Sequence, residues 1–357
     1  MGSLLSTDIL RKAAALGASD IHLISGSHPM VRVDGKLIQM PTFTMLSADQ
    51  CSALIYQLMN EQQKARFEQS WSLDFSIQVD ENRYRANVFY QRHGMEAAVR
   101  VIPNRIPTLE ELLLPRAVAQ LADLSRGLVL MTGPTGSGKT TTLAALINLI
   151  NQARRANIIT IEDPIEFLYS NLNSVVSQRE IGVHAPDFSS ALKYILRQDP
   201  DVVLIGELRD YETISAALTV AETGHLVFGT LHTMDAAQTV DRIVDVFPHS
   251  QQAQVRTQLA GVLQAVISQA LIPKAQGRGR VPACEVMMVT PAVSNLIRQG
   301  KTHEIYSIIE MGAMEGMISM ERALADLVRR GLIDPSNAVG RTVSQEMASL
   351  RRRSTDI

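Results

Sequence analysis

Hydrophobic and polar positions in the first hundred residues predict a small mixed α/β unit. A helix is expected over 9–16, because Gly17 ends its apolar periodicity. Two short strands, 28–33 and 36–40, flank Asp34-Gly35, a dipeptide that supplies positive φ at a tight hairpin turn. The unit therefore begins with a helix and a hairpin.

A helical repeat and an antiparallel strand pair are expected next. Apolar residues recur at helical spacing over 54–59 and then alternate strictly with polar ones over 71–79 and 84–90. The alternating residues are Trp71, Leu73, Phe75, Ile77 and Val79, followed by Tyr84, Ala86, Val88 and Tyr90. Strict alternation is typical of strands buried on one face only.

The polar face of these strands is rich in arginine. Arg83, Arg85 and Asn87 share it, and the strand expected over 97–102 adds Arg100. From residue type alone, arginines on such a face are interpreted as solvated sheet surface.

Prolines mark the end of this unit. Pro103 and Pro107 stand within five residues of each other, a spacing that opposes both helix and central strand. We therefore predict a first domain over 1–105, a linker over 106–117 and a second domain over 118–357.

Short apolar runs alternate with helical segments beyond the linker. Strands are expected over 128–131, 158–161, 202–205 and 226–230, with a helix that starts at Lys139. Continuously apolar strands between helices predict a mostly parallel sheet covered on both faces.

The last third is predicted to be mainly helical. One helix face is expected to carry Val255, Leu259, Val262, Leu263, Val266, Ile267 and Leu271. A strand near 281–289 and helices beyond Pro291 follow. The expected fold class is thus α/β, with a helical C-terminal portion.

Composition describes an ordinary globular protein. The 357 residues are 46% hydrophobic and 20% charged, with a net charge of -2, which argues against an electrostatic nucleic-acid binder. The only cysteines, Cys51 and Cys284, lie far apart and fit a reducing cytoplasm without a thiolate metal site. No apolar run reaches the length of a membrane-spanning helix.

A phosphate-binding motif occupies 133–140. It matches G-x-x-x-x-G-K-[ST] at every required position, after a predicted strand and before a predicted helix. Backbone N–H groups would surround the phosphates, Lys139 would reach the β- and γ-phosphates, and Thr140 would ligate Mg²⁺. The candidate nucleotide-binding residues are Gly133, Pro134, Thr135, Gly136, Ser137, Gly138, Lys139, Thr140 and Thr141. The sequence therefore predicts ATP binding with Mg²⁺.

Carboxylates end two of the predicted strands. The run 199–207 resembles a Walker B strand, but Gly206 stands where many such enzymes carry the Mg²⁺-binding Asp, so Glu207 would bind the ion directly or through water. The strand before it delivers Glu162, Asp163 and Glu166. Strand ends of this kind form one crevice in open α/β sheets, and spacing alone does not choose the general base.

Histidines flank the strand expected over 226–230. His225 precedes it and His232 follows it, and the pair could sense the γ-phosphate. A lone histidine more often satisfies a local hydrogen bond, and a metal site lacks a third ligand at suitable spacing.

Together these four segments resemble the Walker A, Asp, Walker B and His boxes of the secretion ATPase superfamily. Within it the chain is similar to the PilT type, the pilus retraction ATPases, from about Gly17 to Leu332. Further matching segments are 83–87, 126–130, 178–180 and 241–248.

This resemblance implies a PAS-like N-terminal domain, a RecA-like ATPase domain and a ring of six subunits. It implies Glu166 as general base, Glu207 as the Walker B acid, and His225 and His232 as coupling residues. Glu162 remains a further catalytic candidate. Arg85 and Arg100 match arginines that reach the nucleotide from the N-terminal domain, so the resemblance replaces the surface interpretation for these two.

The resemblance also implies partners and a location. A membrane platform protein of the pilus machinery is expected, with a second retraction ATPase as a further candidate, and the motor would lie in the cytoplasm, peripheral to the inner membrane. Assembly ATPases of the superfamily usually carry a longer N-terminal region and a four-cysteine zinc site. This chain shows neither feature, which favours retraction over assembly. One departure is the segment 292–299, in which Ser294 and Gln299 replace an Arg and a Glu of the retraction family.

Three alternatives remain open. The first is a pilus assembly or accessory secretion-type ATPase. The second, disfavoured by the balanced charge, is a nucleic-acid translocase. The third is a nucleotide sensor without turnover, which the complete phosphate-binding motif opposes.

Overall fold

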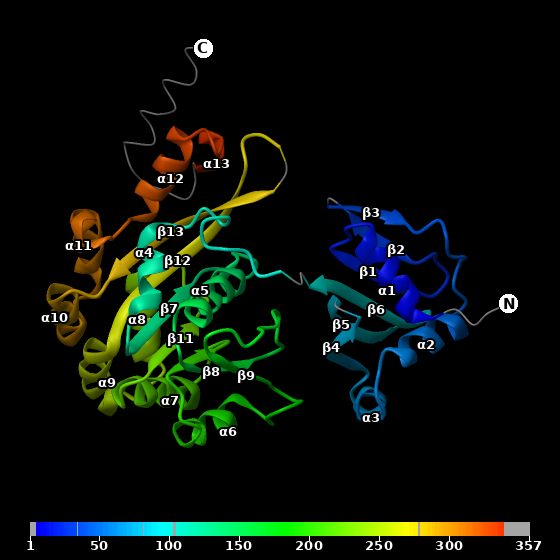
Figure 1. The fold of residues 1–357 in the computed structure, drawn as a ribbon, viewed down its shortest axis with the longest axis horizontal. Coiled ribbons are helices and arrows are strands. Elements are labelled where there is room, and N and C mark those ends of the chain that lie inside the picture. The colour runs from blue at the N-terminus through cyan, green and yellow to red at the C-terminus, as the bar shows by residue number, and fades with distance from the viewer. Residues whose placement is uncertain (1–4, 34, 81, 103–104, 278, 339–357) are drawn as a thin grey trace, which may run out of the picture. The chain divides into compact units, whose positions relative to one another are not determined.

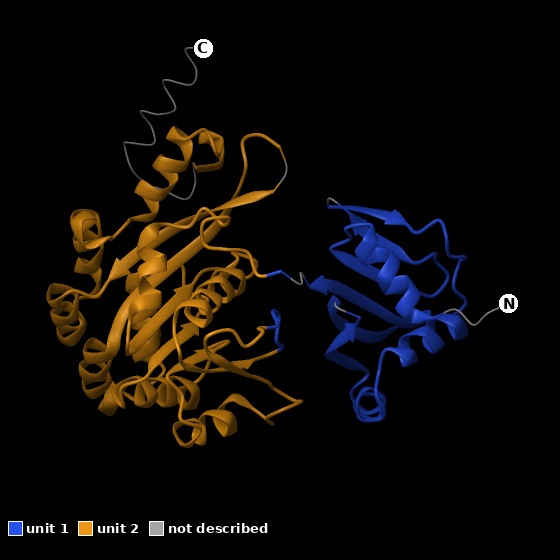
Figure 2. Cartoon of the chain, viewed as in Figure 1, with its two compact units in different colours: residues 1–105, 164–168 blue, residues 106–163, 169–357 orange. Residues whose placement is uncertain are grey.

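The computed structural model describes residues 5–33, 35–80, 82–102, 105–277 and 279–338. The chain divides into two compact units, one of residues 1–105 with 164–168 and one of residues 106–163 with 169–357 (Figure 2).

The first unit is built on a six-stranded antiparallel sheet with the strand order β3-β2-β1-β6-β5-β4. Its strands are β1 (Asp20–Ile24), β2 (Met30–Val33), β3 (Lys36–Gln39), β4 (Ser72–Val79), β5 (Asn82–Gln91) and β6 (Gly94–Ile102). Its helices are α1 (Ser6–Ala15), α2 (Ala48–Gln57) and α3 (Glu61–Ser70). The predicted first helix, the hairpin and the alternating strand pair are confirmed.

Two details of this unit differ from the prediction. Trp71, expected to begin a strand, instead ends α3 in the left-handed region with φ of 60°, and its side chain is 69% exposed. Helix α3 itself was not predicted, because Phe67 is its only buried residue and one apolar position gives no periodic pattern. Asn60 starts the helix with a capping box, which supplies a local signal that periodicity lacks.

The second unit holds a seven-stranded sheet with the order β13-β12-β7-β11-β10-β8-β9 (Figure 1). Its strands are β7 (Gly127–Thr132), β8 (Asn157–Glu162), β9 (Val175–Glu180), β10 (Val202–Ile205), β11 (Leu226–Thr230), β12 (Leu263–Pro273) and β13 (Arg280–Met288). All neighbours are parallel except β12 and β13. The predicted parallel sheet is confirmed.

Helices cover both faces of this sheet. They are α4 (Arg116–Gln120), α5 (Lys139–Ala153), α6 (Phe188–Lys193), α7 (Tyr211–Glu222), α8 (Ala236–Asp245), α9 (His249–Val262), α10 (Pro291–Gln299), α11 (Ile305–Met311), α12 (Met320–Arg329) and α13 (Pro335–Ala338). None of the helices in the described part of the chain is both long and apolar enough to cross a bilayer.

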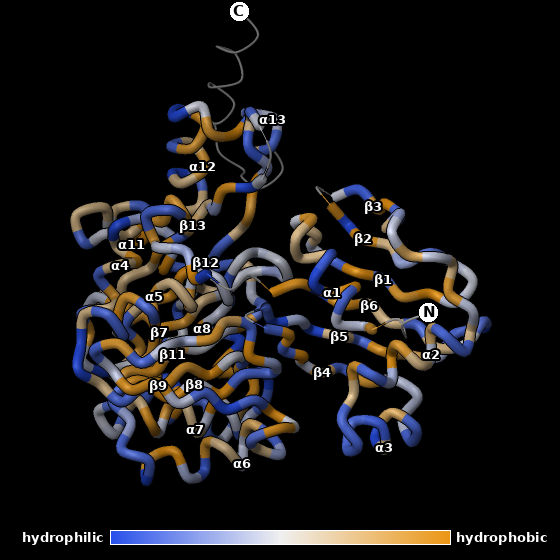
Figure 3. Tube along the Cα trace, turned by 45° about the vertical axis from the view of Figure 1, so that its right-hand side comes forward, coloured by the Kyte–Doolittle hydropathy of each residue, from blue (hydrophilic) through white to orange (hydrophobic). Residues whose placement is uncertain are grey.

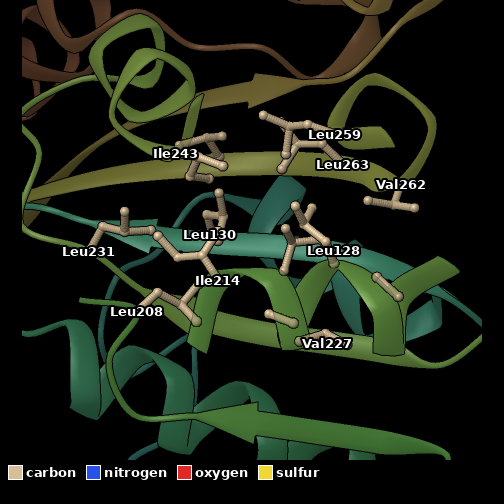
Figure 4. Close-up of a cluster of buried hydrophobic side chains, with 14 of the residues drawn as sticks. Leu128, Leu130, Leu208, Ile214, Val227, Leu231, Ile243, Leu259, Val262 and Leu263 are labelled. Carbon is tan, nitrogen blue, oxygen red and sulfur yellow. The ribbon is translucent and has the colours of Figure 1, made fainter. Parts of the chain in front are cut away.

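Alternation along β7 builds a separate core on each face. Leu128 and Leu130 pack with Ile214 and Ile243 of α7 and α8 (Figure 4), whereas Val129 pairs with apolar residues of α4 and α5 on the other face. Strands β7 and β11 in the middle of this sheet are accordingly mostly hydrophobic in Figure 3. Burial on both faces fixes the strand positions and hence the loops at their ends.

The helix predicted across 255–271 is wrong in its second half. Helix α9 ends at Val262, and Leu263–Pro273 form strand β12 between β7 and β13. The apolar run fits both structures because a strand buried on two faces has no alternation to separate it from a buried helix. Strand β9 was also not predicted, since only Glu180 of its six residues is buried.

Residues 106–117, expected as a linker, belong to the second unit. Leu109 and Ala117 are buried in the core on the α5 face, and Ile106, Leu112 and Leu114 pack against it. The apolar residues of 106–117 therefore have a packing role that the neighbouring turn signals concealed.

Candidate functional site

The phosphate-binding loop, residues 133–138, lies at the carboxyl end of β7. Gly133 and Gly138 have φ values of 135° and 88°, a region that favours glycine. A Cβ at Gly133 would lie 2.3 Å from the carbonyl oxygen of Gln269 on β12. Both glycines are thus required by the backbone path as well as by the ligand that the motif predicts.

Lys139 begins α5 and points into the loop. Its ammonium donates to the carbonyl oxygens of Gly133 at 2.7 Å and Pro134 at 3.2 Å, and the side chain is only 9% exposed. Burial lowers the pKa of Lys139, while the charge of Glu207 opposes that shift. A buried cation at a helix N-terminus favours an anion there.

Ser137 adds a second indication of an anion. Its side chain is buried, and its Oγ has no hydrogen-bond partner in the described part of the chain. A buried hydroxyl of this kind costs free energy unless a ligand or water binds it. The loop therefore fits phosphate by its glycines, its cation and its unpartnered hydroxyl, with Thr140 and Thr141 half-buried in the next helical turn.

Gly206 ends the Walker B-like strand because a side chain would be crowded there. A Cβ would meet the carbonyl oxygen of Ile161 at 3.2 Å and the Cα of Glu162 at 3.3 Å on the neighbouring strand β8. The Gly206 carbonyl also accepts a hydrogen bond from the Thr230 hydroxyl. The tight contact between β8 and β10 explains why Glu207, one residue later, is the acid at this strand end.

Glu207 joins the ends of two strands. Its Oε1 lies 3.3 Å from His232 Nε2, just beyond β11, and its Oε2 lies 2.6 Å from Arg209. Burial raises the pKa of Glu207, but the Arg209 hydrogen bond and the charges of Arg209, His232 and Lys139 outweigh it, so the pKa falls below its usual value. Glu207 is therefore a stable carboxylate facing a cationic environment.

Glu162 lies at the end of β8, opposite Gly206 in the parallel register. It is buried, accepts a hydrogen bond from Thr160 at 2.7 Å and lies 3.4 Å from Gln178. Asp163 follows directly. The hydrogen bond to Glu207 raises the pKa of Arg209, and the charge of Asp163 adds to that shift. The carboxyl edge of one sheet thus carries the phosphate-binding loop together with Glu162, Glu207 and His232.

His225 lies at the opposite edge. It precedes β11, and its carbonyl accepts from Gly127 at the start of β7, roughly 15 Å along the strands from the phosphate loop. Its Nδ1 lies 3.0 Å from both the Thr223 hydroxyl and the Val220 carbonyl. The two histidines thus lie at opposite ends of β11, and the role of His225 as a coupling residue stays a prediction.

Arg85 and Arg100 lie directly opposite each other on β5 and β6 of the first unit. Arg85 binds both oxygens of Asp74, at 3.2 and 2.9 Å, and Arg100 donates to Asp20 at 3.1 Å. Asp20 also lies 3.8 Å from Arg32, so Arg32 joins Arg85 and Arg100 on this side of the sheet. The pairing gives the predicted nucleotide-binding arginines defined positions.

Glu166, the predicted general base, lies in the segment 164–168, which groups with the first unit. It is half-buried. Its role as base stays a prediction.

Sequence reasoning missed two residues of this edge. Arg209 follows Glu207 by two positions, and its spacing from the acid could have suggested an ion pair. Gln269 comes from β12, which the sequence predicted as helix, so no pattern placed it beside the loop.

A cavity of about 370 Å³ adjoins the loop within the second unit. Its lining includes Gly138, Thr141 and Thr142 from the loop and α5, and Leu271 and Arg280 from β12 and β13. It combines apolar walls with a few charged groups, which is typical of a small-molecule site.

Comparison with known proteins agrees with this geometry. Residues 2–326 match the family model described as Type II/IV secretion system protein. The type IV pilus retraction ATPase PilT of Pseudomonas aeruginosa is 49% identical over 335 residues, 93% of this chain and 96% of that protein. A twitching motility protein of Neisseria gonorrhoeae is 46% identical over 344 residues, 96% of this chain and 91% of that protein.

A solved structure shows the same fold. A crystal structure of the pilus retraction motor PilT with bound ADP superposes with a TM-score of 0.90 at 45% identity, covering 98% of this chain and 99% of that one. The chain therefore belongs to the type II/IV secretion system protein family, as an ATPase of its PilT-like, pilus retraction branch.

Proposed function

We propose that this protein is a motor that hydrolyses ATP to retract type IV pili. The observation that carries the proposal is the buried Lys139 in a glycine loop at the same sheet edge as Glu207 and His232. Full-length similarity to the PilT ATPase and to its ADP-bound structure supports it.

ATP would bind with its phosphates in the loop and its nucleoside in the adjoining cavity. Lys139 would turn from the Gly133 and Pro134 carbonyls to the β- and γ-phosphates. Mg²⁺ would supply charge neutralisation, with the Thr140 hydroxyl and Glu207 as its protein partners. Among the described residues, no group of three or more His, Cys, Asp or Glu is placed to hold a metal ion. An ion ligated mainly by phosphate and water needs no such group.

Hydrolysis requires a base and charge stabilisation. We assign the base to Glu166, with Glu162 as the alternative acid, and the γ-phosphate contact to His232 through its pairing with Glu207. Arg85 and Arg100 would leave their carboxylate partners to neutralise charge that develops on the transferred phosphoryl group.

The mechanical step would involve a ring of six copies that acts on an inner-membrane pilus platform protein from the cytoplasmic side, with a second retraction ATPase as a further partner. The segment 292–299 forms α10, with Val293, Leu296 and Ile297 buried in the core. Ser294 donates to Ala260 on α9 at 2.9 Å, and Gln299 is exposed. The two positions that depart from the retraction family thus lie outside the apolar face.

One experiment tests both halves of the proposal. ATP turnover and mass by light scattering are measured for the purified protein and for Glu166→Gln, and the same genes are expressed in a retraction-defective bacterium. We expect turnover from a hexamer, loss of turnover in the variant, and restored twitching only with the native gene. Turnover without restored twitching would favour the assembly or accessory motor.

The departing positions offer a sharper arm of that experiment. The double variant Ser294→Arg with Gln299→Glu restores the charges of the retraction family without touching the ATP site. If only this variant restores twitching, the native protein does not retract the pilus of the test bacterium. Its ATPase activity would then serve a different pilus, whose partner protein contacts a different surface of α10.

A further inference from the structure

Strand β12 brings Gln269 to the back of the phosphate-binding loop. The parallel register sets Ser268 opposite Thr132, the last residue of β7, so Gln269 follows opposite the first loop residue, Gly133. Gln269 is 3% exposed. It is therefore a buried amide beside the loop that the proposed function assigns to ATP.

The Gln269 amide connects the C-terminal end of the loop to helix α5. Its Nε2 donates to the Ser137 carbonyl at 2.7 Å, and its Oε1 accepts from the Thr142 hydroxyl at 2.9 Å in the first turn of α5. The Cys284 thiol lies 3.8 Å from the same Oε1. The amide thus provides one donor to the loop and one acceptor to the helix.

The loop glycines fit closely around Gln269. A Cβ at Gly133 would lie 2.3 Å from its carbonyl oxygen, and a Cβ at Gly138 would lie 2.8 Å from its Nε2. The two required glycines of the motif therefore face one residue of β12. Close backbone packing on this side leaves the loop little room to shift away from the phosphates.

We infer that Gln269 is a positioning residue for nucleotide binding: it holds the Ser137 carbonyl inward and away from the phosphates, so that the neighbouring N–H groups face the ligand. The inference rests on the proposed ATP site. An amide suits the position because the Ser137 carbonyl needs a donor and the Thr142 hydroxyl needs an acceptor. A carboxylate would meet the Ser137 carbonyl with like partial charge and would add a negative charge beside the phosphates.

The test uses Gln269→Met, which keeps side-chain length and apolar volume but removes both hydrogen bonds, and Thr142→Val, which removes one of them from the helix side. Affinity for a fluorescent ADP, the KM and kcat of ATP hydrolysis, and thermal stability are measured on the full-length protein. We expect Gln269→Met to weaken ADP binding about tenfold or more, because displaced loop N–H groups no longer align with the phosphates. Thr142→Val should have a smaller effect in the same direction, and the double variant should be less than additive.

The matched control is Asn151→Leu, at the far end of the same helix. Asn151 is a buried amide that donates to the Ser170 carbonyl at 2.8 Å and accepts from Leu172. We expect it to lower thermal stability without changing ADP affinity. If Gln269→Met lowers stability as the control does and leaves ADP affinity and KM unchanged, Gln269 is only a packing residue and the inference is wrong.

Two further outcomes separate this inference from the proposed function. If Lys139→Ala abolishes ADP binding while Gln269→Met and Thr142→Val preserve it, the site stands and the inference fails. If Lys139→Ala itself leaves binding intact, the proposed ATP site is wrong. Should Gln269→Met not fold, Gln269→Glu takes its place, because its carboxylate cannot donate to the Ser137 carbonyl; unchanged ADP affinity in that variant overturns the role of the amide.

Discussion

The two edges of the second unit's sheet carry similar residues but differ in what those residues contact. Strand β11 has a histidine at each end. At the carboxyl edge, His232 faces Glu207, which in turn pairs with Arg209 and lies within the electrostatic reach of Lys139. At the amino edge, the ring of His225 lies beside Thr223 and the Val220 carbonyl, at the turn between α7 and β11.

Strand polarity, rather than residue type, therefore separates residues that can act on a phosphate from residues that stabilise the fold. Parallel strands bring all their carboxyl ends to one edge, where helix N-termini and loops leave polar groups unpaired. At the amino edge helices end and strands begin, so polar side chains complete turns: Asp201, for example, accepts from the Asn157 backbone at 2.8 Å. Variants at the two edges should therefore affect different properties.

The largest effect is expected at Lys139. Lys139→Ala should lower ATP turnover about 10³-fold or more, because it removes the cation that the loop presents to the phosphates. A steady-state phosphate-release assay measures this. The control is Lys193→Ala, in α6, a lysine that stacks on Tyr194 and should change turnover less than about twofold. Retained turnover in Lys139→Ala would show that ATP is not hydrolysed at the carboxyl edge of the sheet.

Glu207→Gln should lower turnover about 10²-fold or more, since it removes the charge that His232 and Arg209 share and the proposed Mg²⁺ partner. The pKa of Glu207 lies below its usual value, so Glu207 stays ionised at neutral pH and loses its proton-linked stabilisation only as pH falls through that lowered pKa. A turnover profile from pH 6 to 9 should therefore show the same shape for both proteins at different heights. A flattened acid limb in the variant would show that Glu207 titrates in this range after all.

The histidine pair gives the direct test of the comparison. His232→Ala should lower turnover about tenfold to a hundredfold, whereas His225→Ala should lower it less than about threefold and act mainly on stability. Turnover and melting temperature are measured on both variants. An equal loss of turnover would show that His225 acts on a nucleotide, and the edge comparison would fail for a single chain.

The smallest effect is expected at Glu285, a buried acid on β13 beside the carboxyl edge. Its Oε1 accepts from the Ala236 backbone at 2.9 Å, and burial raises its pKa to about 7, with the charge of Asp235 in the same direction. A raised acid pKa leaves stability unaffected below the unfolded pKa and lowers it as pH rises towards 7.

Glu285→Gln should remove that pH dependence. Melting temperature measured from pH 5 to 8.5 should fall less steeply for the variant than for the native protein, while the exposed Glu304→Gln should leave the slope unchanged. Identical slopes for native protein and Glu285→Gln would show that the carboxyl group does not titrate in this window.

Much of this architecture could be read from local patterns. The motif at 133–140, the strands on either side of it and the acids that end them predicted one sheet edge as the site, and β7, β8, β10 and β11 confirm that sheet. Glycines at positive φ, an apolar run and a helix start can all be predicted from sequence, because each depends only on residues close together in the chain.

Other features depend on residues distant in sequence. Strand β12 was hidden because its apolar run fits a buried helix equally well, and only its place between β7 and β13 makes it a strand. The apolar residues of 106–117 were concealed in the same way by the prolines beside them.

Local patterns in the chain establish which residue types are available for phosphate chemistry and in which order they occur. Which of them meet depends on the folded sheet, which sets His232 beside Glu207, His225 at the far edge and Gln269 behind the loop. The reason is physical: a motif is fixed by short-range backbone geometry, whereas a site is fixed by strand order and register, which arise from burial summed over the whole sheet.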